Sequence, residues 1–320
     1  MVERKSPVRK ISFAMLVILI VLFCIFPFFQ MLSMSLKYQW DWGNPSLIPT
    51  QLNFEAYKEL LNIDQGVKNV PESIINLLEE NPDLTKDQRN TILDKYRESG
   101  DVFPFMRYFG NSLALAGIAA LLSVFIAILG AYALSRLNFP GRSTINRGVL
   151  FVYMFGGILL LIPLYKLFVG MGLLSAPGGA FTSLLVIYLV QTLPVSLYML
   201  GNFFRTIPFS IEEAAMIEGA SRIVIIFRII IPLSISAIVT VYIYAFMIAW
   251  NEYMFASVFL KGFPDLYTLP MGLKELFVSK NAVWDRIMSA SVLTATPVIA
   301  LFMLIQKNLV SGMSEGGVKE

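Results

Sequence analysis

The sequence predicts an all-α, polytopic membrane protein with six transmembrane helices. Hydrophobic residues make up 56% of the 320 residues and charged residues only 15%, and the mean hydropathy is +0.68. A soluble domain of this length carries more charge and fewer apolar residues. The apolar residues also fall into six separate stretches, and each is close to the ~20 residues that a helix needs to cross a bilayer.

The six predicted spans lie at residues 11–32, 109–134, 150–171, 183–204, 236–259 and 287–306. The first follows four basic residues, but its apolar run is too long for a cleavable signal peptide, so residues 1–36 are expected to hold a retained anchor. Three later spans contain prolines, which are Pro163, Pro194 and Pro297. Membrane helices tolerate proline where neighbouring helices satisfy the freed backbone groups, so the spans are expected to pack as a bundle.

Basic residues between the spans predict the orientation. Arginines and lysines gather before the first span, after the second span and between the fourth and fifth spans, and loops of this kind stay in the cytoplasm. We therefore expect both termini to be cytoplasmic and the chain to lie in the bacterial cytoplasmic (inner) membrane. Residues 37–108 are then an extracytoplasmic loop, and residues 109–310 form a five-helix transmembrane core.

The long loop at residues 37–108 is the one large hydrophilic segment, and its middle is predicted to be a small helical hairpin. Its apolar residues have helical spacing, and Thr85 and Gln88 are spaced as a capping box. Those apolar residues are Ile74, Leu77 and Leu78 in the first helix and Ile92, Leu93 and Tyr96 in the second. Two interpretations stay open: a solvated lid over the bundle, or a docking surface for an external partner.

Composition excludes several kinds of function. The chain has no histidine and a single cysteine, Cys24, so a metal site or histidine-based catalysis is not expected. The net charge of +3 is small and the basic residues are scattered, which argues against a nucleic-acid partner. No phosphate-binding GxxxxGK[ST] motif is present, so any ATP must be bound by another chain.

The coupling segment, residues 207–232, is predicted to be two cytoplasmic helices broken at a glycine. Ser210 is a suitable N-cap and Glu213, three residues later, completes a capping box. Gly219 favours the left-handed conformation that ends a helix. In the second helix Ile223, Ile226, Phe227 and Ile230 are spaced to share one face. Pro232 marks the start of the fifth span.

The first helix of the coupling segment has the composition of a docking element. Ala214 and Ala215 add little bulk, so the helix fits a narrow cleft, and the acidic residues Glu212 and Glu213 can meet a basic group of a partner. These residues alone leave a second interpretation open, in which Ser210 and Glu213 only cap a connecting helix.

The same segment resembles the EAA loop of binding-protein-dependent ABC import permeases. The family pattern is EAA, three residues, Gly, nine residues and then I-x-L-P. Glu213-Ala214-Ala215, Gly219, Ile229 and Pro232 match it, and Ile231 replaces the leucine. In this family the loop is a coupling helix that docks into a cleft of the ATPase subunit, so the resemblance implies this role for residues 210–230.

Further motifs resemble the carbohydrate-uptake branch of that family. They are Asn111-Ser-Leu, Ala131-Tyr-Ala-Leu-Ser-Arg136, Phe139-Pro-Gly-Arg142, Leu161-Ile-Pro-Leu-Tyr-Lys-Leu-Phe168 and Ala249-Trp-Asn-Glu-Tyr253. The tail at residues 311–320 is similar to the end of the smaller permease subunit of maltose transporters. There the tail reaches between the ATPase subunits, which implies ATPase contacts for Gly316 and Gly317. The alternative is a frayed terminus, and the glycines are expected to favour an extended or turning backbone.

The resemblance also implies partners and a solute. The chain would form half of a translocation pathway with a second, different permease, above two copies of an ABC ATPase, and would receive solute from an extracytoplasmic binding protein. It would not be an enzyme and would hold no cofactor, since ATP is bound by the partner subunit. The solute would be a sugar such as maltose or a maltodextrin, with a non-sugar solute such as glycerol phosphate as the alternative.

Asn251 and Glu252 are polar residues inside the predicted fifth span. Such residues are costly in a membrane helix, so they indicate a functional site, and a translocation pathway is the natural setting. An interhelical hydrogen bond that only holds the bundle together is the other interpretation.

Two other classes of function compete with the importer. A secondary transporter often has an internal inverted repeat and an ion site on broken helices, and we detect neither in the sequence. A membrane-embedded enzyme needs a cluster of carboxylates or histidines at the membrane face, and the chain has no histidine and no such acidic cluster beyond the coupling segment.

Overall fold

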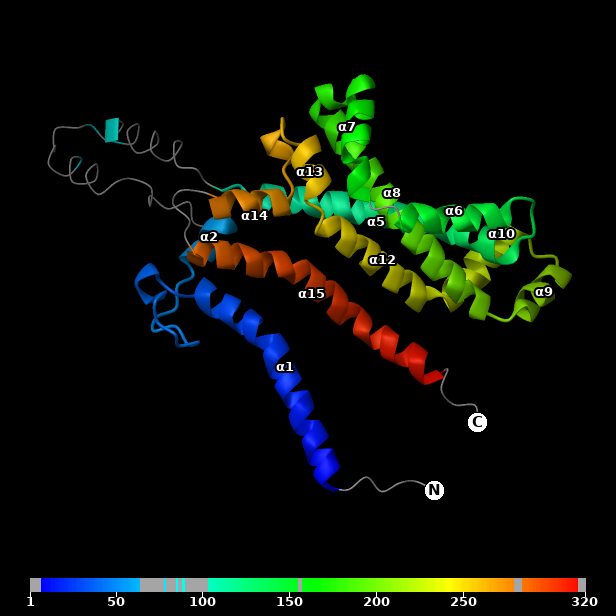
Figure 1. Cartoon of the computed structure of the whole chain (residues 1–320), viewed down its shortest axis with the longest axis horizontal. Coiled ribbons are helices and arrows are strands. Elements are labelled where there is room, and N and C mark those ends of the chain that lie inside the picture. Colours follow the sequence, from blue (N-terminus) through cyan, green and yellow to red (C-terminus); the bar gives the residue numbers. More distant parts are fainter. Residues whose placement is uncertain are drawn as a thin grey trace. The chain divides into compact units, whose positions relative to one another are not determined.

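The computed structural model describes residues 7–63, 78, 85, 88–89, 103–154, 157–278 and 284–315. The residues so described form helices and connecting loops without a strand, which confirms the all-α class (Figure 1). The helices of eight or more residues are α1 (Pro7–Ser35), α5 (Phe105–Arg136), α6 (Arg142–Met154), α7 (Leu161–Gly170), α8 (Pro177–Thr206), α9 (Phe209–Ile217), α12 (Ile235–Trp250), α14 (Leu269–Val278) and α15 (Trp284–Glu315).

Shorter helical elements connect these helices. They are η1 (Gln39–Asp41), α2 (Glu55–Leu60), η2 (Gly157–Leu160), η3 (Leu173–Ser175), α10 (Arg222–Ile225), η4 (Ile226–Ile230), α11 (Ile231–Leu233), α13 (Met254–Phe259) and η5 (Pro264–Leu266). The element η4 is a π-helix.

Four of the predicted spans are single helices long and apolar enough to cross a membrane. They correspond to Ser12–Ser35 in α1, to all of α5, to all of α8 and to Trp284–Met303 in α15. Pro194 and Pro297 lie inside α8 and α15. Both helices continue through their prolines, in line with the tolerance expected of membrane helices.

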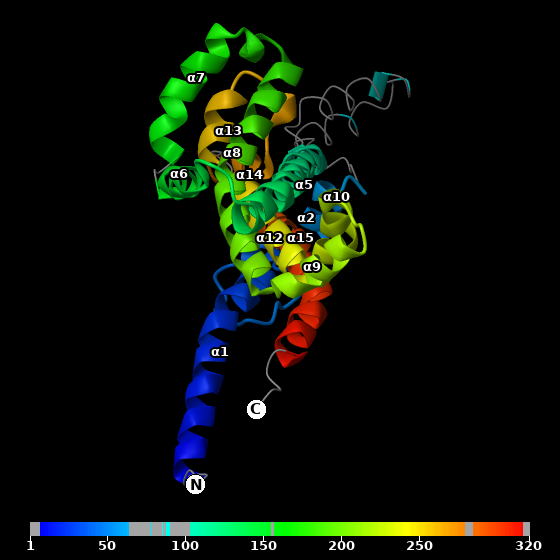
Figure 2. The same cartoon turned by 90° about the vertical axis from the view of Figure 1, so that its right-hand side faces the viewer.

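The third and fifth predicted spans are bent pairs of helices, and the total reaches six only if each pair is one span. α6 and the η2–α7 unit are bent by 87°, and Figure 2 shows α7 rising steeply from the end of α6. Arg222–Leu233 and α12 are bent by 82°. The predicted fifth span at 236–259 was too long, because α12 ends at Trp250 and α13 is a separate short helix.

The chain divides into two compact units. Unit 1 contains Met1–Met106 and Leu273–Thr294, and unit 2 contains Arg107–Gly272 and Ala295–Glu320. The coupling segment lies entirely in unit 2.

Small residues let helices α5 and α8 approach closely within unit 2. A Cβ placed on Gly130 of α5 would lie 2.6 Å from Cδ2 of Leu197, and one on Gly201 of α8 would lie 4.0 Å from Cβ of Ala131. Small residues at such crossings are typical of membrane helix pairs, where close backbone approach replaces the hydrophobic driving force. The core continues from α5 and α8 into the coupling segment through Ala215, which packs in the same cluster of buried residues.

In unit 1, polar contacts connect the loop after α1 with the start of α15. Asn53 donates to the Asp285 carboxylate over 3.1 Å, and Arg286 forms a 2.7 Å ion pair with Glu59. Lys37 is buried and donates to the backbone carbonyls of Asn44 and Ser46, each at 2.7 Å. The early part of the predicted extracytoplasmic loop is therefore a defined structure.

The predicted helical hairpin falls mostly outside the described residues. Ile74, Leu77, Ile92, Leu93 and Tyr96 are all outside them. At the predicted capping box, Gln88 Oε1 accepts from the backbone N–H of Thr85 at 3.1 Å. This is the contact that the glutamine of a capping box makes.

Candidate coupling site

Helix α9 forms the first half of the coupling segment, and proline defines where it begins. Its N-cap is Pro208, with Ile207 and Pro208 both extended (ψ 126° and 131°). A residue before proline is driven out of the helical region, so the helix cannot start before this point. The predicted capping box was therefore wrong. Ser210 is the second residue of the helix, and the N-cap residue Pro208 makes no side-chain capping hydrogen bond.

The end of α9 confirms the role predicted for Gly219. Its φ is +84°, its N–H donates to the Met216 carbonyl at 3.0 Å, and the Ala220 N–H donates to the Ala215 carbonyl at 2.9 Å. These two bonds are those of a Schellman motif. A Cβ on Gly219 would meet nothing within 4 Å, so only the backbone conformation selects glycine here.

Glu212 holds α9 to helix α5. Its Oε2 accepts from the Tyr132 hydroxyl at 2.9 Å, and its Oε1 lies 2.8 Å from Nε of Arg136. The latter contact is an ion pair rather than an aligned hydrogen bond. The side chains of Arg136 and Glu212 are only 9% and 1% exposed, so both charges are withdrawn from water. A buried carboxylate survives only with partners of this kind.

Arg136 also holds the end of α8. Its Nη2 donates to the carbonyls of Phe204 at 2.5 Å and Ile207 at 2.6 Å, and its guanidinium carbon lies 5.8 Å from the centre of the Phe209 ring. These carbonyls are at the C-terminus of a helix, where a cation is favoured. One guanidinium thus connects the ends of α5 and α8 with the start of α9.

Sequence reasoning did not give Tyr132 and Arg136 a role. Both belong to the Ala131–Arg136 motif, which carried the resemblance to the family, but nothing local in that motif indicates a partner on α9. The usable signal was a tyrosine and an arginine four residues apart near the end of a span. That spacing places them on one helix face.

The opposite face of α9 is free in this chain. Ser210, Glu213 and Ala214 are exposed, and Ile217 is 88% exposed. These positions have the spacing of one helix face, whereas Glu212 and Ala215 are buried. The two neighbouring glutamates therefore face different surroundings, with Glu212 buried and Glu213 exposed. The two neighbouring alanines also differ, with Ala215 buried and Ala214 exposed. Figure 1 shows α9 projecting beyond the ends of α5, α8 and α12.

The second half of the coupling segment differs from the prediction in its buried face. Ser221 caps α10, accepting from the Val224 N–H at 3.4 Å. Ile226 and Ile230 are buried as expected, but Ile223 and Phe227 are 69% and 49% exposed. Phe227 lies within the π-helix η4, whose wider turn shifts its side chain away from the 3.6-residue period. Ile223 lies in α10, before that turn. Pro232 lies in α11, and the 82° bend follows it, before α12.

Asn251 and Glu252 lie at a break between helices and not within a continuous span. Asn251 is exposed and donates back to the Met247 carbonyl at 2.9 Å. Glu252 accepts from the backbone N–H groups of Phe255 at 2.8 Å and Ala256 at 3.1 Å. Glu252 therefore caps the N-terminus of α13, where a carboxylate is favoured.

The predicted tail is only partly described. Helix α15 continues to Glu315, so the expected extended backbone is wrong for residues 311–315. One glycine, Gly312, costs only about 1 kcal/mol in a helix, which is too little to end a long one. Gly316 and Gly317 lie outside the described residues.

Comparison with known proteins finds a matching family and several relatives of this chain. Residues 119–315 match the family described as binding-protein-dependent transport system inner membrane component. The chain is 38% identical to the inner membrane ABC transporter permease protein YcjP of Escherichia coli K12, over 100% of both chains. It is 36% identical to the sulfoquinovosyl glycerol transport system permease protein SmoH of Agrobacterium fabrum, over 71% of this chain and 78% of that protein.

Two further relatives extend the likeness. The chain is 30% identical to the maltose/maltodextrin transport system permease protein MalG of Salmonella typhimurium, over 100% of this chain and 99% of that protein. A solved bacterial ABC transporter that imports the acidic polysaccharide alginate matches with a TM-score of 0.70 at 20% identity, covering 96% of this chain and 98% of that chain. At that identity the structure supports the fold alone.

Proposed function

The chain belongs to the inner membrane components of binding-protein-dependent transport systems, and from that premise we propose that α9 couples an ATPase subunit to the membrane spans. The observation that carries the proposal is that one face of α9 is buried and the other is exposed. Glu212 is held by Tyr132 and Arg136 on one side, while Glu213 and Ala214 are free on the other. A helix fixed on one face and free on the other suits the transfer of a movement.

The free face of α9 suits a cleft with a basic group. Ala214 keeps the centre of the face narrow, Glu213 provides a carboxylate, and Ile217 provides an apolar contact. Carboxylates pair with arginine in short, charge-assisted hydrogen bonds. The proposed occupant is an ABC ATPase subunit, with two copies in the complete transporter. This chain would bind no nucleotide, and the ATPase subunits would bind and hydrolyse ATP.

We assign the chain a second, different permease as its partner in the pathway and an extracytoplasmic solute-binding protein as its source of solute. The description of the family as binding-protein-dependent supports the solute-binding protein. Both termini and the coupling segment would be cytoplasmic, and residues 37–108 external. A reporter fused after Gly100 should therefore be extracytoplasmic, and a cytoplasmic reporter there would contradict this topology.

The solute in this proposal is a sugar or glycoside. Relatives are named for maltodextrin and for sulfoquinovosyl glycerol, two solutes that share hydroxylated sugar rings. Maltose is one candidate within this class, and glycerol phosphate is the non-sugar alternative. Calorimetric binding of a sugar panel to the cognate binding protein would identify the solute.

Reconstitution tests the function as a whole. The chain, its second permease and the ATPase should co-purify, and uptake into proteoliposomes should require ATP and the solute-loaded binding protein. Uptake that persists without the ATPase and follows an ion gradient would indicate a secondary transporter instead.

A further inference from the structure

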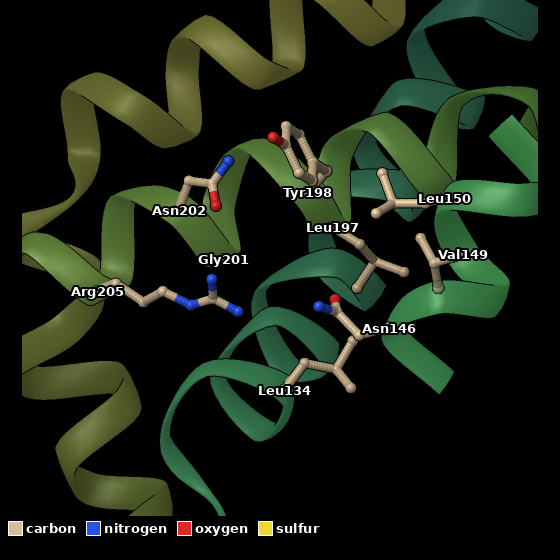
Figure 3. A pocket seen from close by; sticks show the side chains of 9 residues that line it. All are labelled: Leu134, Asn146, Val149, Leu150, Leu197, Tyr198, Gly201, Asn202 and Arg205. Carbon is tan, nitrogen blue, oxygen red and sulfur yellow. The ribbon is translucent and has the colours of Figure 1, made fainter. Parts of the chain in front are cut away.

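A small hollow lies where helices α5, α6 and α8 of unit 2 meet (Figure 3). Its lining includes one residue of α5, two of α6 and three of α8, namely Leu134, Asn146, Leu150, Leu197, Gly201 and Arg205. The cavity volume is about 30 Å³, which is room for one or two water-sized groups. The hollow can therefore receive the oxygen atoms of one small polar group, but not a sugar ring.

The spacing of residues on α8 and α6 forms this hollow. On α8, Leu197, Gly201 and Arg205 follow one another at intervals of four residues, so they share one helix face. Gly201 has no side chain to fill the space between the other two. On α6, which packs against α8, Asn146 and Leu150 have the same spacing. Figure 3 shows the Arg205 guanidinium and the Asn146 amide pointing toward one another, with the two leucines at the other end of the hollow. The hollow thus has a polar end and an apolar end.

Arg205 has no partner for its charge in the part of the chain that the structure describes. The residue is exposed, and no hydrogen bond or ion pair joins it to another described residue. An arginine in the last turn of a helix often binds the free carbonyls there, but Arg136 already binds those of Phe204 and Ile207. No carboxylate of α5, α6 or α8 is available either, because residues 102–211 contain neither aspartate nor glutamate.

The length of α8 places Arg205 at the level of lipid headgroups. The helix has 30 residues, so it is about 45 Å long, which matches the ~40–45 Å thickness of a bilayer with its headgroups. Arg205 is in its last turn, outside the hydrocarbon core. Beyond the hollow, α6 has an apolar surface, since Leu150, Phe151 and Val152 are 38%, 68% and 49% exposed. A group bound at Arg205 therefore has apolar side chains on its membrane side.

We propose that this hollow binds the phosphate group of an anionic membrane phospholipid. A guanidinium binds phosphate oxygens through charge-assisted hydrogen bonds, and the Asn146 amide can donate another. Leu150 and Leu197 would contact the adjoining apolar part of the same lipid. Basic pockets between membrane helices on the cytoplasmic side are typical sites for anionic headgroups. The assignment to the cytoplasmic leaflet rests on the topology in the proposed function.

Lipid binding to the full chain measures this site directly. Native mass spectrometry of the chain in detergent, titrated with phosphatidylglycerol, gives the number of bound lipids and the dissociation constant of the tightest site. Arg205→Gln should weaken that site by at least about tenfold, through loss of the charge-assisted hydrogen bonds. Asn146→Asp preserves side-chain shape and should also weaken the site, because the new carboxylate repels phosphate and competes for Arg205. This variant keeps the test valid even if Arg205→Gln fails to fold.

Arg147→Gln is the matched control. Arg147 is exposed and adjacent to Asn146 on α6, but it does not line the hollow. A diffuse attraction between basic residues and anionic lipids would weaken equally when either arginine is lost. A site formed by the hollow should lose affinity with Arg205→Gln and keep it with Arg147→Gln.

Inorganic phosphate separates a lipid from a free anion. Phosphatidylglycerol should remain bound in an excess of inorganic phosphate, because its apolar part adds contacts that the free ion lacks. Displacement by inorganic phosphate, with equal thermal stabilisation of the chain by the two ligands, would mean that the hollow takes a free phosphate and would overturn the lipid assignment.

The remaining outcomes are also decisive. Equal loss of affinity in Arg205→Gln and Arg147→Gln would indicate a diffuse attraction, and unchanged affinity in both Arg205→Gln and Asn146→Asp would mean that the hollow holds no headgroup. Either result would overturn the inference. Failure of the unmodified chain to assemble with an ATPase would instead contradict the proposed function, and would leave the lipid titration of the chain unaffected.

Discussion

Glu212 of α9 and Arg136 of α5 form a buried ion pair in which Oε1 and Nε are 2.8 Å apart. Arg136 simultaneously binds the two carbonyls of Phe204 and Ile207 at the end of α8. The pair therefore joins three helices at the point where the coupling segment leaves the spans.

The first prediction concerns this ion pair. Glu212→Ala leaves the Arg136 guanidinium buried without its carboxylate, and the expected loss of stability is about 3–5 kcal/mol. Glu212→Gln keeps an acceptor for Tyr132 and should cost less. Thermal unfolding of the purified chain measures both, with the exposed neighbour Glu213→Ala as the control, expected within about 0.5 kcal/mol of the unmodified chain. Equal midpoints for Glu212→Ala and Glu213→Ala would contradict the burial of this pair.

The second prediction concerns the free face of α9. Because Pro208, and not Ser210, is the N-cap residue of α9, Glu213 is not part of a capping box, so Glu213→Gln and Glu213→Ala should leave the fold intact and weaken only the contact with the ATPase. Loss of a charge-assisted hydrogen bond corresponds to roughly tenfold weaker association or more. Solute-stimulated ATP hydrolysis of the assembled complex is the measurement. Glu218→Gln, an exposed carboxylate at the C-cap of α9, is the control. If the two glutamine variants behave alike, the docking role of Glu213 is wrong.

The third prediction concerns Gly219. Its φ of +84° costs an ordinary L-residue about 1–2 kcal/mol, and the free space around it means that side-chain size contributes little. Gly219→Ala and Gly219→Val should therefore both lower coupling and stability, whereas Gly219→Asn should be milder because asparagine tolerates this conformation. Unfolding midpoints and uptake in proteoliposomes would be compared. A full effect only for valine would show that steric contact, and not backbone conformation, selects glycine.

The fourth prediction concerns the loop after α1. The backbone N–H of Thr50 donates to the Asp41 carboxylate and lowers the pKa of that carboxyl below its ordinary value of 3.8. A lowered pKa means that the contact stabilises the folded loop fully above the ordinary value and is lost as pH falls through the lowered one. Asp41→Asn should therefore speed hydrogen exchange of the loop at neutral pH, and the difference should shrink below about pH 4. A pH-independent difference would show that charge on Asp41 is not the cause.

The fifth prediction concerns the tail. Deletion of residues 311–320 should lower uptake without preventing membrane insertion, through loss of ATPase contacts that we assign to Gly316 and Gly317. Deletion of residues 316–320 alone leaves the helical part to Glu315 intact and separates the two contributions. Full uptake after both deletions would mean that the terminus has no role in coupling.

Much of the site was accessible from local sequence. The sequence predicts both the conformation of Gly219 and the two-helix form of the coupling segment. The reason is that the left-handed conformation at the end of a helix is adopted mostly by glycine. The N-cap of α9 is Pro208, two residues before the predicted Ser210, because the restriction that Pro208 imposes on Ile207 outweighs the capping potential of Ser210. The predicted buried face of the second helix is right for Ile226 and Ile230 and wrong for Phe227, because a π-turn leaves no periodic signal in the sequence.

The sequence by itself determined four single-helix spans, the glycine that ends α9 and the place of the coupling segment, because length, hydropathy and backbone restriction act within a few neighbouring residues. Only the tertiary structure decided which of two adjacent glutamates anchors α9 and which one is free. Successive residues of a helix differ by about 100° in direction, so Glu212 and Glu213 necessarily face different surroundings. Which of the two is buried depends on Arg136 and Tyr132. Both belong to α5, which is distant in the sequence, so no local pattern connects them with the two glutamates.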